Sequence, residues 1–348
     1  MINKTMRGVA YRADRTVKVI EYPIPEPSYG EVLLQIKAAA ICGSDLHRYR
    51  KAGELVAGKA PWVPGHEPAG VVVALGEGCQ RLQIGDRVCV FHWLGCGHCR
   101  HCLAGMMQWC EHRQAIGHPA AFGSDADYMV IPERNCLPLP DVLTFEDGAL
   151  IACIAGTCFA ALRKLRVNGE DTITIFGQGP VGLMGAIMAQ AMGARVIGLD
   201  ITEERLELAR SLGIEETVNP ALSSLPDAVL KLSGGEGVDA ALETSGNGAA
   251  HQGVIDVLRR GGRAVFVGFG ATGPTVNLCA IIGKQLTLMG SHVMPISYYW
   301  DLVAFILAHD LQPKFKRLVT HRFPITEAVE AFRVADSGTA GKVMFVWE

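Results

Sequence analysis

The 348-residue sequence is poor in charge and has little excess of either sign. Only 19% of its residues are Asp, Glu, Lys or Arg, and the formal net charge is −3. Proteins that bind nucleic acids or anionic membrane surfaces are usually basic, so neither partner is expected. The 49% hydrophobic content is enough to fill cores and too high for a disordered chain.

Long apolar runs are also lacking. No uninterrupted run reaches the roughly 18–20 residues needed to cross a bilayer. The start, MINKTMRGVAYRADR, has no hydrophobic signal-peptide core. We therefore expect a cytoplasmic protein. The length predicts two domains.

The eleven cysteines are odd in number and clustered, which favours a reducing compartment over a disulfide framework. Four of them occupy fifteen positions, and this spacing lets one short lobe, at about residues 95–111, surround a tetrahedral Zn²⁺. Disulfide pairing within the lobe is the alternative. The predicted ligands of this structural zinc are Cys96, Cys99, Cys102 and Cys110.

Hydrophobic patterning changes at about Leu150. The preceding residues predict strands and turns, whereas the following ones alternate apolar strands with helices. A βαβ unit is expected over 172–212. Further buried strands are expected at 238–242, 263–267 and 286–289.

A glycine-rich turn within this unit indicates a dinucleotide site. Gly177 permits a tight turn, Gly179 lets the backbone approach a pyrophosphate, and Gly182 lets helix and strand pack closely. Pro180 and Val181 complete the loop. A tight turn without a ligand is the alternative.

Asp200 ends the next predicted strand. Its carboxylate can accept hydrogen bonds from both hydroxyls of an adenine ribose and would repel a 2′-phosphate, which favours NAD over NADP. Arg205 is placed to reach the same ribose. The alternatives are a solvated helix cap for Asp200 and a solvated helix face for Arg205.

Cys42 and His66 offer a soft thiolate and an imidazole from separate segments, as the ligands of a catalytic zinc commonly do. Such a site needs three protein ligands and one open position. Taken with the glycine loop and the four-Cys lobe, these residues make the chain similar to the zinc-dependent medium-chain alcohol dehydrogenases. The resemblance covers essentially the whole chain, and the other matching motifs are Cys42-Gly43-Ser44-Asp45-Leu46-His47, Gly65-His66-Glu67-Pro68-Ala69-Gly70 and Gly85-Asp86-Arg87-Val88.

The resemblance implies an α/β protein. It implies a GroES-like β-rich catalytic domain over 1–154, a Rossmann NAD-binding domain with a doubly wound parallel sheet over 155–289, and a return to the catalytic domain over 290–348. It also implies two zinc ions per subunit and a homo-oligomer, with a tetramer the expected form.

The same resemblance assigns roles near the catalytic zinc. The third ligand is Cys153 or Cys158, and the match of the surrounding residues favours Cys153. Glu67 enters the coordination shell transiently, or is a buried carboxylate that only makes a hydrogen bond nearby. Asp45 accepts the ring N–H of His66 and fixes its tautomer.

The resemblance also implies a proton relay and a nicotinamide site. Ser44 takes the substrate proton and passes it through the nicotinamide ribose to His47, for which a surface position without a role is the alternative. Main-chain groups near Val267, Gly268 and Met289 hold the carboxamide.

Two departures bear on the substrate. Gly43 stands where the simple primary-alcohol branch often has a basic residue, and the C-G-S-D-x-H form is similar to the polyol branch. Cys153 instead resembles the simple-alcohol branch. We expect NAD-linked, zinc-dependent oxidation of a secondary alcohol or polyol, and the reverse reduction. Arg48, Tyr49, His92 and His118 are candidate polar contacts.

Two other functions remain open. The first is a primary-alcohol dehydrogenase of the same family. The second, from another class, is a non-catalytic sensor that binds zinc and nucleotide.

Overall fold

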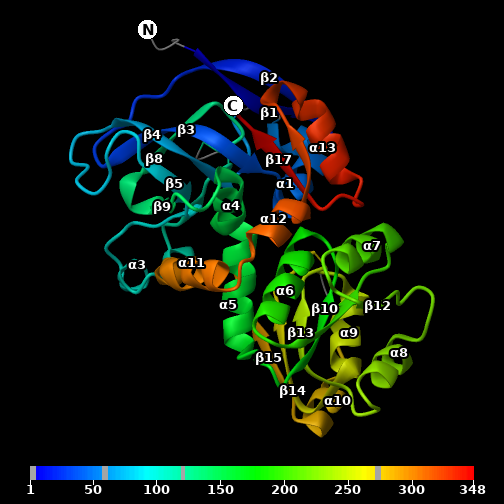
Figure 1. Ribbon diagram of the computed structural model, residues 1–348. Coiled ribbons are helices and arrows are strands. Elements are labelled where there is room, and N and C mark those ends of the chain that lie inside the picture. Colours follow the sequence, from blue (N-terminus) through cyan, green and yellow to red (C-terminus); the bar gives the residue numbers. More distant parts are fainter. Residues whose placement is uncertain (1–4, 57–61, 119–121, 271–275) are drawn as a thin grey trace. The chain divides into compact units, whose positions relative to one another are not determined.

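The computed structural model describes residues 5–56, 62–118, 122–270 and 276–348 (Figure 1). Its contacts divide the chain into two compact units. The first comprises Met1–Cys153, Pro295–Tyr299 and Val319–Glu348, and the second comprises Ile154–Met294 and Trp300–Leu318. Sequence analysis assigned all of 290–348 to the first domain, whereas 300–318 groups with the second because helix α12 (Gln312–Leu318) packs on α6 (Pro180–Ala191).

The first unit is built on a seven-stranded, mostly antiparallel sheet. Its longest strand, β3, reads EVLLQIKAAA, and its apolar side chains are buried in the core. The last strand pairs with the end of β3, which brings the C-terminal segment next to Ile41. The strands are β3 (Glu31–Ala40), β4 (Pro68–Leu75), β5 (Arg87–Val90), β8 (Tyr128–Pro132), β9 (Cys136–Pro138), β16 (Val319–Phe323) and β17 (Lys342–Val346).

Smaller elements surround this sheet. A separate hairpin precedes it, formed by β1 (Thr5–Ala13) and β2 (Thr16–Pro23). The helix α13 (Ala328–Asp336) packs on β2 and β17. The remaining elements are α1 (Gly43–Arg50), α2 (Ala52–Val56), β6 (Trp93–Leu94), α3 (Arg100–Leu103), β7 (Gln114–Ala115) and α4 (Phe145–Leu150).

The second unit contains a six-stranded parallel sheet in the order β12-β11-β10-β13-β14-β15. The order reverses between β10 and β13, which is where a doubly wound sheet binds its ligand. Its strands are β10 (Thr172–Phe176), β11 (Arg195–Leu199), β12 (Glu216–Val218), β13 (Val238–Glu243), β14 (Leu258–Phe266) and β15 (Thr287–Gly290).

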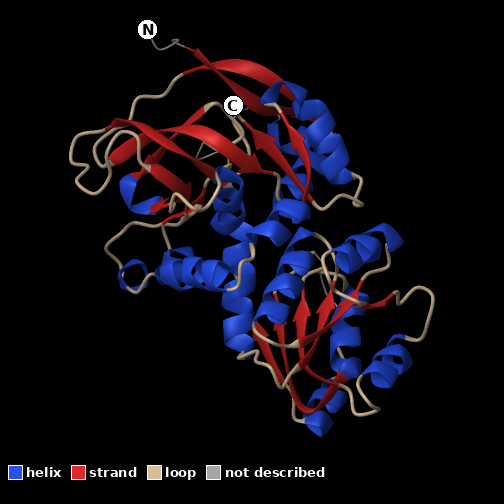
Figure 2. Ribbon diagram, in the orientation of Figure 1, coloured by secondary structure: helices blue, strands red, loops and turns tan. Residues whose placement is uncertain are grey.

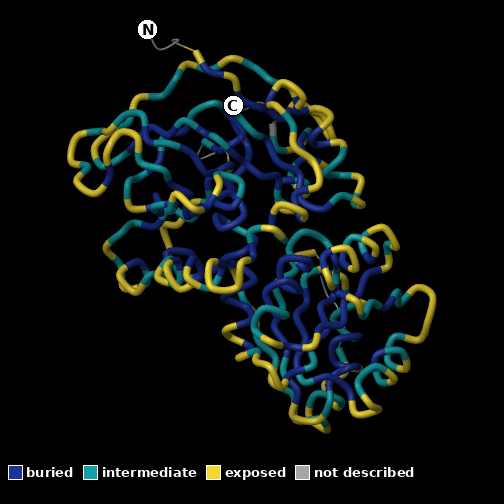
Figure 3. The backbone as a smooth tube through the Cα atoms, viewed as in Figure 1, coloured by how far each residue is buried: buried dark blue, intermediate teal, exposed yellow. Residues whose placement is uncertain are grey.

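Helices cover both faces of the parallel sheet (Figure 2). Figure 1 shows α5 and α6 on one side of the strands and α8 and α9 on the other, and each pair is in contact. The central strands are buried, as the dark blue of Figure 3 shows, because both faces are covered. The helices are α5 (Gly156–Leu165), α6, α7 (Glu203–Ser211), α8 (Leu225–Leu232), α9 (Gly248–Val257), α10 (Leu278–Lys284), α11 (Tyr299–Ala308) and α12. A β-rich unit and a doubly wound parallel sheet confirm the predicted fold class.

Among the described residues, one helix is long and apolar enough to cross a membrane by length and composition. It comprises the 21 residues Phe145–Leu165, and its apolar window is 83% buried inside the protein. In the middle, residues Ile151–Ala155 form a π-helical turn between α4 and α5.

Candidate metal and dinucleotide sites

The four cysteines of the lobe come together. Cys96, Cys99, Cys102 and Cys110 each offer a sulfur, and these atoms all lie within 4.8 Å of one another. Main-chain N–H groups approach two of the sulfurs: Cys102 N lies 3.5 Å from Cys99 Sγ and Cys96 N lies 3.5 Å from Cys110 Sγ. Such donors favour thiolates, and four thiolates at this spacing suit a structural Zn²⁺.

A second cluster joins Cys42, His66, Glu67 and Cys153, whose ligand atoms also lie within 4.8 Å of one another. Cys42 precedes α1, the His-Glu pair precedes β4, and Cys153 lies in the π-helical turn. The Cys153 sulfur is 3.8 Å from His66 Nε2. Two thiols, an imidazole and a carboxylate are a donor set that fits zinc.

Asp45 fixes the imidazole of this cluster. It is fully buried; its Oδ1 lies 3.1 Å from His66 Nδ1, and its Oδ2 accepts a hydrogen bond from Cys42 N at 3.0 Å. With Nδ1 held by the carboxylate, Nε2 is the nitrogen left for a metal. Burial opposes protonation of His66, but the charges of Asp45 and Cys42 outweigh it and raise its pKa.

The cluster also favours a thiolate at Cys42. The hydrogen bond with Cys153 has the largest effect and lowers the pKa of Cys42. Burial acts to raise this pKa, and the nearby positive charge of His66 acts to lower it. The same contact, with burial, raises the pKa of Cys153. A metal held by both sulfurs would require both thiols to lose their protons.

Sequence reasoning missed a buried cation beside this cluster. Lys342 Nζ on β17 lies 2.6 Å from Glu67 Oε2, and both side chains are almost completely buried. Burial raises the pKa of Glu67 to about 8, although the charge of Lys342 opposes this rise. The available signal was a lysine immediately before the apolar run Val343-Met344-Phe345-Val346.

The structure separates the two candidates for the third ligand. Cys158 lies in α5, buried in the second unit, and its thiol donates to the main-chain oxygen of Val181 at 3.1 Å. Of these two, only Cys153 belongs to the cluster with Cys42 and His66.

The predicted relay residues Ser44 and His47 are both exposed. They lie three residues apart in α1 and therefore on one face of that helix.

The four candidate substrate contacts have different surroundings. The His92 ring centroid is 5.0 Å from that of His66, and its Nδ1 lies 2.9 Å from Ala152 O. Arg48 approaches Asp45 at 3.7 Å. Tyr49 instead belongs to the core and donates to Arg15 O, while His118 is exposed.

A second buried carboxyl was not identified from the sequence. Asp125 and Ser124 are both fully buried. Within the part of the chain that the structure describes, neither carboxyl oxygen of Asp125 nor the Ser124 hydroxyl has a hydrogen-bond partner. Burial raises the pKa of Asp125 well above its ordinary value, and the charges of Asp45 and Glu67 add to this effect.

The glycine loop has the geometry of a phosphate-binding turn. Gly177 follows β10 with a φ of +87°, and Gly179 precedes α6, whose first residue is Pro180. A Cβ at position 182 would lie 1.7 Å from Gly177 O, so only glycine fits there. Val181 occupies the first turn of the helix, where main-chain N–H groups are free of helical partners.

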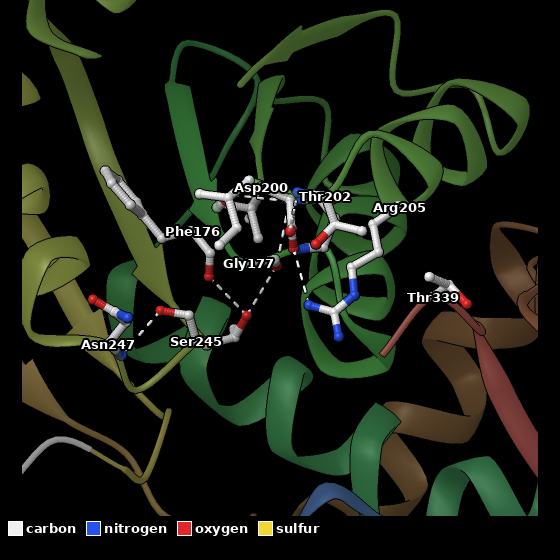
Figure 4. A network of polar contacts seen from close by, with 12 residues as sticks. Phe176, Gly177, Asp200, Thr202, Arg205, Ser245, Asn247 and Thr339 are labelled. Carbon is white, nitrogen blue, oxygen red and sulfur yellow. Dashed lines mark hydrogen bonds and ion pairs between the residues drawn. The ribbon is translucent and has the colours of Figure 1, made fainter. Parts of the chain in front are cut away.

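Asp200 stands at the end of β11, beside this loop. It accepts hydrogen bonds from Gln178 N at 2.7 Å and Thr202 N at 2.9 Å. Arg205 approaches the same carboxylate at 3.3 Å, and Figure 4 shows its guanidinium turned toward Asp200. The ion pair places both predicted ribose-binding side chains together. Val267 and Gly268 follow β14, and Met289 lies in β15.

Comparisons with known proteins match both units. Residues 28–141 match the alcohol dehydrogenase GroES-like domain, and residues 180–308 match the zinc-binding dehydrogenase domain. An uncharacterized zinc-type alcohol dehydrogenase-like protein of Escherichia coli is 33% identical, with 98% of each chain covered. An L-threonine 3-dehydrogenase of Mesorhizobium japonicum is 34% identical, with 100% of each chain covered.

A solved structure shows the same fold. The alcohol dehydrogenase from Thermus sp. ATN1 is 32% identical, with 98% of this chain and 99% of that chain covered and a TM-score of 0.90. Together, the two domain matches and these relatives confirm the resemblance stated from the motifs. The chain therefore belongs to the zinc-dependent medium-chain alcohol dehydrogenase family and is an oxidoreductase.

Proposed function

We propose that the protein catalyses zinc-dependent, NAD-linked oxidation of a secondary alcohol or polyol to the ketone or aldehyde, and the reverse reduction. The observation that carries this proposal is the cluster of Cys42, His66 and Cys153, with Asp45 holding the imidazole. Three ligands leave a fourth position for substrate, unlike the closed four-Cys lobe.

When bound, Zn²⁺ polarises the substrate oxygen and NAD accepts the hydride. The residues of this chain position these groups and move the proton. Ser44 Oγ receives the hydroxyl proton, and His47 delivers it to solvent, consistent with their exposure on one face of α1. Glu67 is held by Lys342 next to the ligands, where its carboxylate would be available to the metal when substrate or product leaves.

The cofactor assignment rests on the glycine loop and Asp200. The N-terminus of α6 receives the pyrophosphate, since its free N–H groups and dipole favour an anion. Asp200 accepts the ribose hydroxyls and excludes a 2′-phosphate. Val267, Gly268 and Met289, at the carboxyl ends of the last two strands, hold the carboxamide.

The substrate class rests on the residues around the ligands. Apart from its chain neighbours and its own helix backbone, no described atom lies within 4 Å of a Cβ placed on Gly43, so the position after Cys42 adds room rather than a bulky basic side chain. His92 and Arg48 add polar groups next to His66 and Asp45. Polar groups that bind extra hydroxyls would be left unpaired by ethanol, which would therefore be a poor substrate.

The test is a panel of primary, secondary and cyclic alcohols and polyols, with NAD reduction followed by absorbance. We expect a secondary alcohol or polyol to have the highest kcat/KM, and Cys42→Ser to abolish turnover. A higher kcat/KM for ethanol or another short primary alcohol than for every secondary alcohol and polyol would contradict the substrate class. No turnover with any alcohol, together with NADH binding, would favour a sensor.

The protein is further proposed to be cytoplasmic and homo-oligomeric, with a tetramer as the expected form. All eleven cysteines are free thiols, which suits a reducing compartment. Among the described strands, β15 is at the sheet edge and pairs on one side only, and α10 exposes Leu278 and Ile282 at 65% and 74%. Light scattering that finds only a stable monomer would refute the proposed homo-oligomer. Fractionation of cells tests the proposed cytoplasmic location.

A further inference from the structure

A buried carboxylate stands at the carboxyl end of the parallel sheet, outside the predicted cofactor contacts. Glu243 is the last residue of β13, and its side chain is fully buried. The neighbouring strand is β10, which leads into the glycine loop. A charge at such a position needs several hydrogen bonds to be tolerated.

One oxygen of this carboxylate organises the loop that follows β13. Glu243 Oε1 accepts hydrogen bonds from Ser245 N at 2.8 Å, from the Ser245 hydroxyl, and from Gly246 N at 2.9 Å. Ser245 Oγ in turn accepts from Asn247 N, the contact drawn between these two residues in Figure 4. Three donors on a single charged acceptor hold the loop in one conformation.

The main chain of Glu243 holds a second loop. Its carbonyl oxygen accepts hydrogen bonds from Val267 N at 2.8 Å and Gly268 N at 3.1 Å, just after β14. The two loops touch: a Cβ on Gly268 would lie 2.3 Å from Gly246 N and 2.8 Å from Glu243 Oε2. Any side chain at position 268 would therefore displace the carboxylate or the loop.

The next residue extends the connection to the glycine loop. The Thr244 hydroxyl approaches the carbonyl oxygens of Phe176 at 2.9 Å and Gly177 at 3.1 Å. The consecutive residues Glu243 and Thr244 thus tie together the loops that follow β10, β13 and β14. In a doubly wound sheet the dinucleotide lies at these strand ends.

The remaining oxygen, Glu243 Oε2, has no hydrogen-bond partner among the described residues. His251 Nε2 on α9 lies 3.6 Å away, too far for a hydrogen bond, and its ring packs on Phe266. A shorter or apolar side chain at this position would leave the three loop donors without this acceptor. The geometry of the loop therefore depends on the length of the Glu243 side chain and on its acceptor oxygen.

We propose that Glu243 is a positioning residue of the dinucleotide site, which fixes the loops at 244–247 and 267–268 in the conformation that receives NAD. The proposal rests on the proposed NAD-linked function. It assigns Glu243 no contact with the cofactor; its effect passes through Ser245, Gly246, Val267 and Gly268.

The experiment measures NADH affinity by fluorescence titration and, separately, the KM values for NAD and alcohol. Glu243→Asp shortens the side chain so that its oxygen no longer reaches the three donors, and we expect NADH affinity to fall about tenfold or more. The KM for alcohol and the zinc content should not change. Glu243→Gln keeps an acceptor oxygen at the original distance and should restore affinity to within about threefold of the wild type.

Asp239 supplies the matched control. It lies on the same strand at the opposite end, and its carboxylate accepts a hydrogen bond from Thr172 N at 2.8 Å and pairs with Arg259. Asp239→Ala should lower the thermal stability of the protein and leave the NADH affinity unchanged. Where Glu243→Asp does not fold, Ser245→Ala, which removes one donor, takes its place and should weaken NADH binding about threefold.

Unchanged NADH affinity in Glu243→Asp would overturn the proposal, and so would unchanged affinity in Ser245→Ala where that variant is used instead. The proposal would also be overturned if Asp239→Ala or Glu243→Gln lost as much NADH affinity as Glu243→Asp. A wild-type protein that fails to bind NADH would instead refute the NAD-linked function itself.

Discussion

Lys342 Nζ and Glu67 Oε2 form an ion pair of 2.6 Å in the interior of the first unit, next to the cluster of Cys42, His66 and Cys153. Both groups are almost inaccessible to water, so each depends on the other for its charge. The pair links the last strand of the chain to the segment that carries His66. A change at either residue of this pair should therefore affect both the stability of the fold and the geometry of the metal site.

Replacing Lys342 by Met should be strongly destabilising above the raised pKa of Glu67, about 8, because it leaves the ionised Glu67 carboxylate buried without a counter-charge. We expect a loss of about 3–5 kcal/mol in the free energy of unfolding, measured by urea denaturation of the zinc-loaded protein above that pH. The double variant Glu67→Gln with Lys342→Met should recover part of this loss. Additive effects of the two substitutions would contradict a coupled pair.

Asp125 should make the protein less stable as the pH rises. Below its ordinary pKa of 3.8 the carboxyl is protonated whether the chain is folded or not. Above that pH the unfolded chain loses the proton and the folded chain keeps it, so each pH unit costs about 1.4 kcal/mol until the folded pKa is reached. The stability of Asp125→Asn relative to the wild type should therefore improve between pH 5 and pH 8.

Asp127 provides a control of opposite sign two residues along the chain. Burial opposes ionisation of this carboxyl, but its hydrogen bonds with Arg7 outweigh burial and lower its pKa. Its contribution to stability is present above pH 3.8 and lost as the pH falls through the folded pKa. Asp127→Asn should therefore lower the free energy of unfolding most near neutral pH. If the difference in this free energy between either variant and the wild type did not change with pH, the assigned ionisation would be refuted.

Zinc content should separate the two cysteine clusters. We expect about two zinc ions per chain by elemental analysis, one for each cluster. Cys99→Ser and Cys42→Ser should each reduce the content to about one. Only Cys99→Ser should lower the thermal stability substantially, and Cys42→Ser should abolish turnover in a folded protein. About one zinc in the supplemented wild type would exclude one of the sites.

Asp200 should determine the choice of cofactor. With its carboxylate against a 2′-phosphate, we expect kcat/KM with NAD to exceed that with NADP by about a hundredfold or more. Asp200→Gly should lower the ratio of kcat/KM with NAD to kcat/KM with NADP, because it removes the repulsion of the 2′-phosphate and releases Arg205 from its ion pair. Adding Arg205→Ala to that variant should raise this ratio again. Comparable use of both cofactors by the native enzyme would contradict the assignment.

The features predicted from sequence were those encoded by local spacing. The four-Cys lobe, the glycine loop with Asp200 and the strand at Thr172–Phe176 each depend on residues close together in the chain, so their patterns are visible without the fold. The contacts of Lys342 were not predictable in this way, because β17 reaches its neighbours only through long-range strand pairing. The burial of Asp125 was not predictable for the same reason.

The fold boundary at 300–318 was misplaced on similar grounds. The apolar pattern of 300–308 predicted a helix, and α11 occupies Tyr299–Ala308. Hydrophobicity shows that a helix will be buried, but not which core buries it. Contacts such as that between Phe305 and Phe159 of α5 decided the assignment, and they exist only after folding.

The π-helical turn at Ile151–Ala155 carries one residue more than a regular α-helical path would accommodate. Each residue of a helix turns the next side chain by about 100°. Deleting Ile151 or Ala152 would therefore change the direction in which the Cys153 sulfur points, and that sulfur now lies 3.8 Å from His66 Nε2. The length of this turn should therefore be as constrained as the identity of its cysteine.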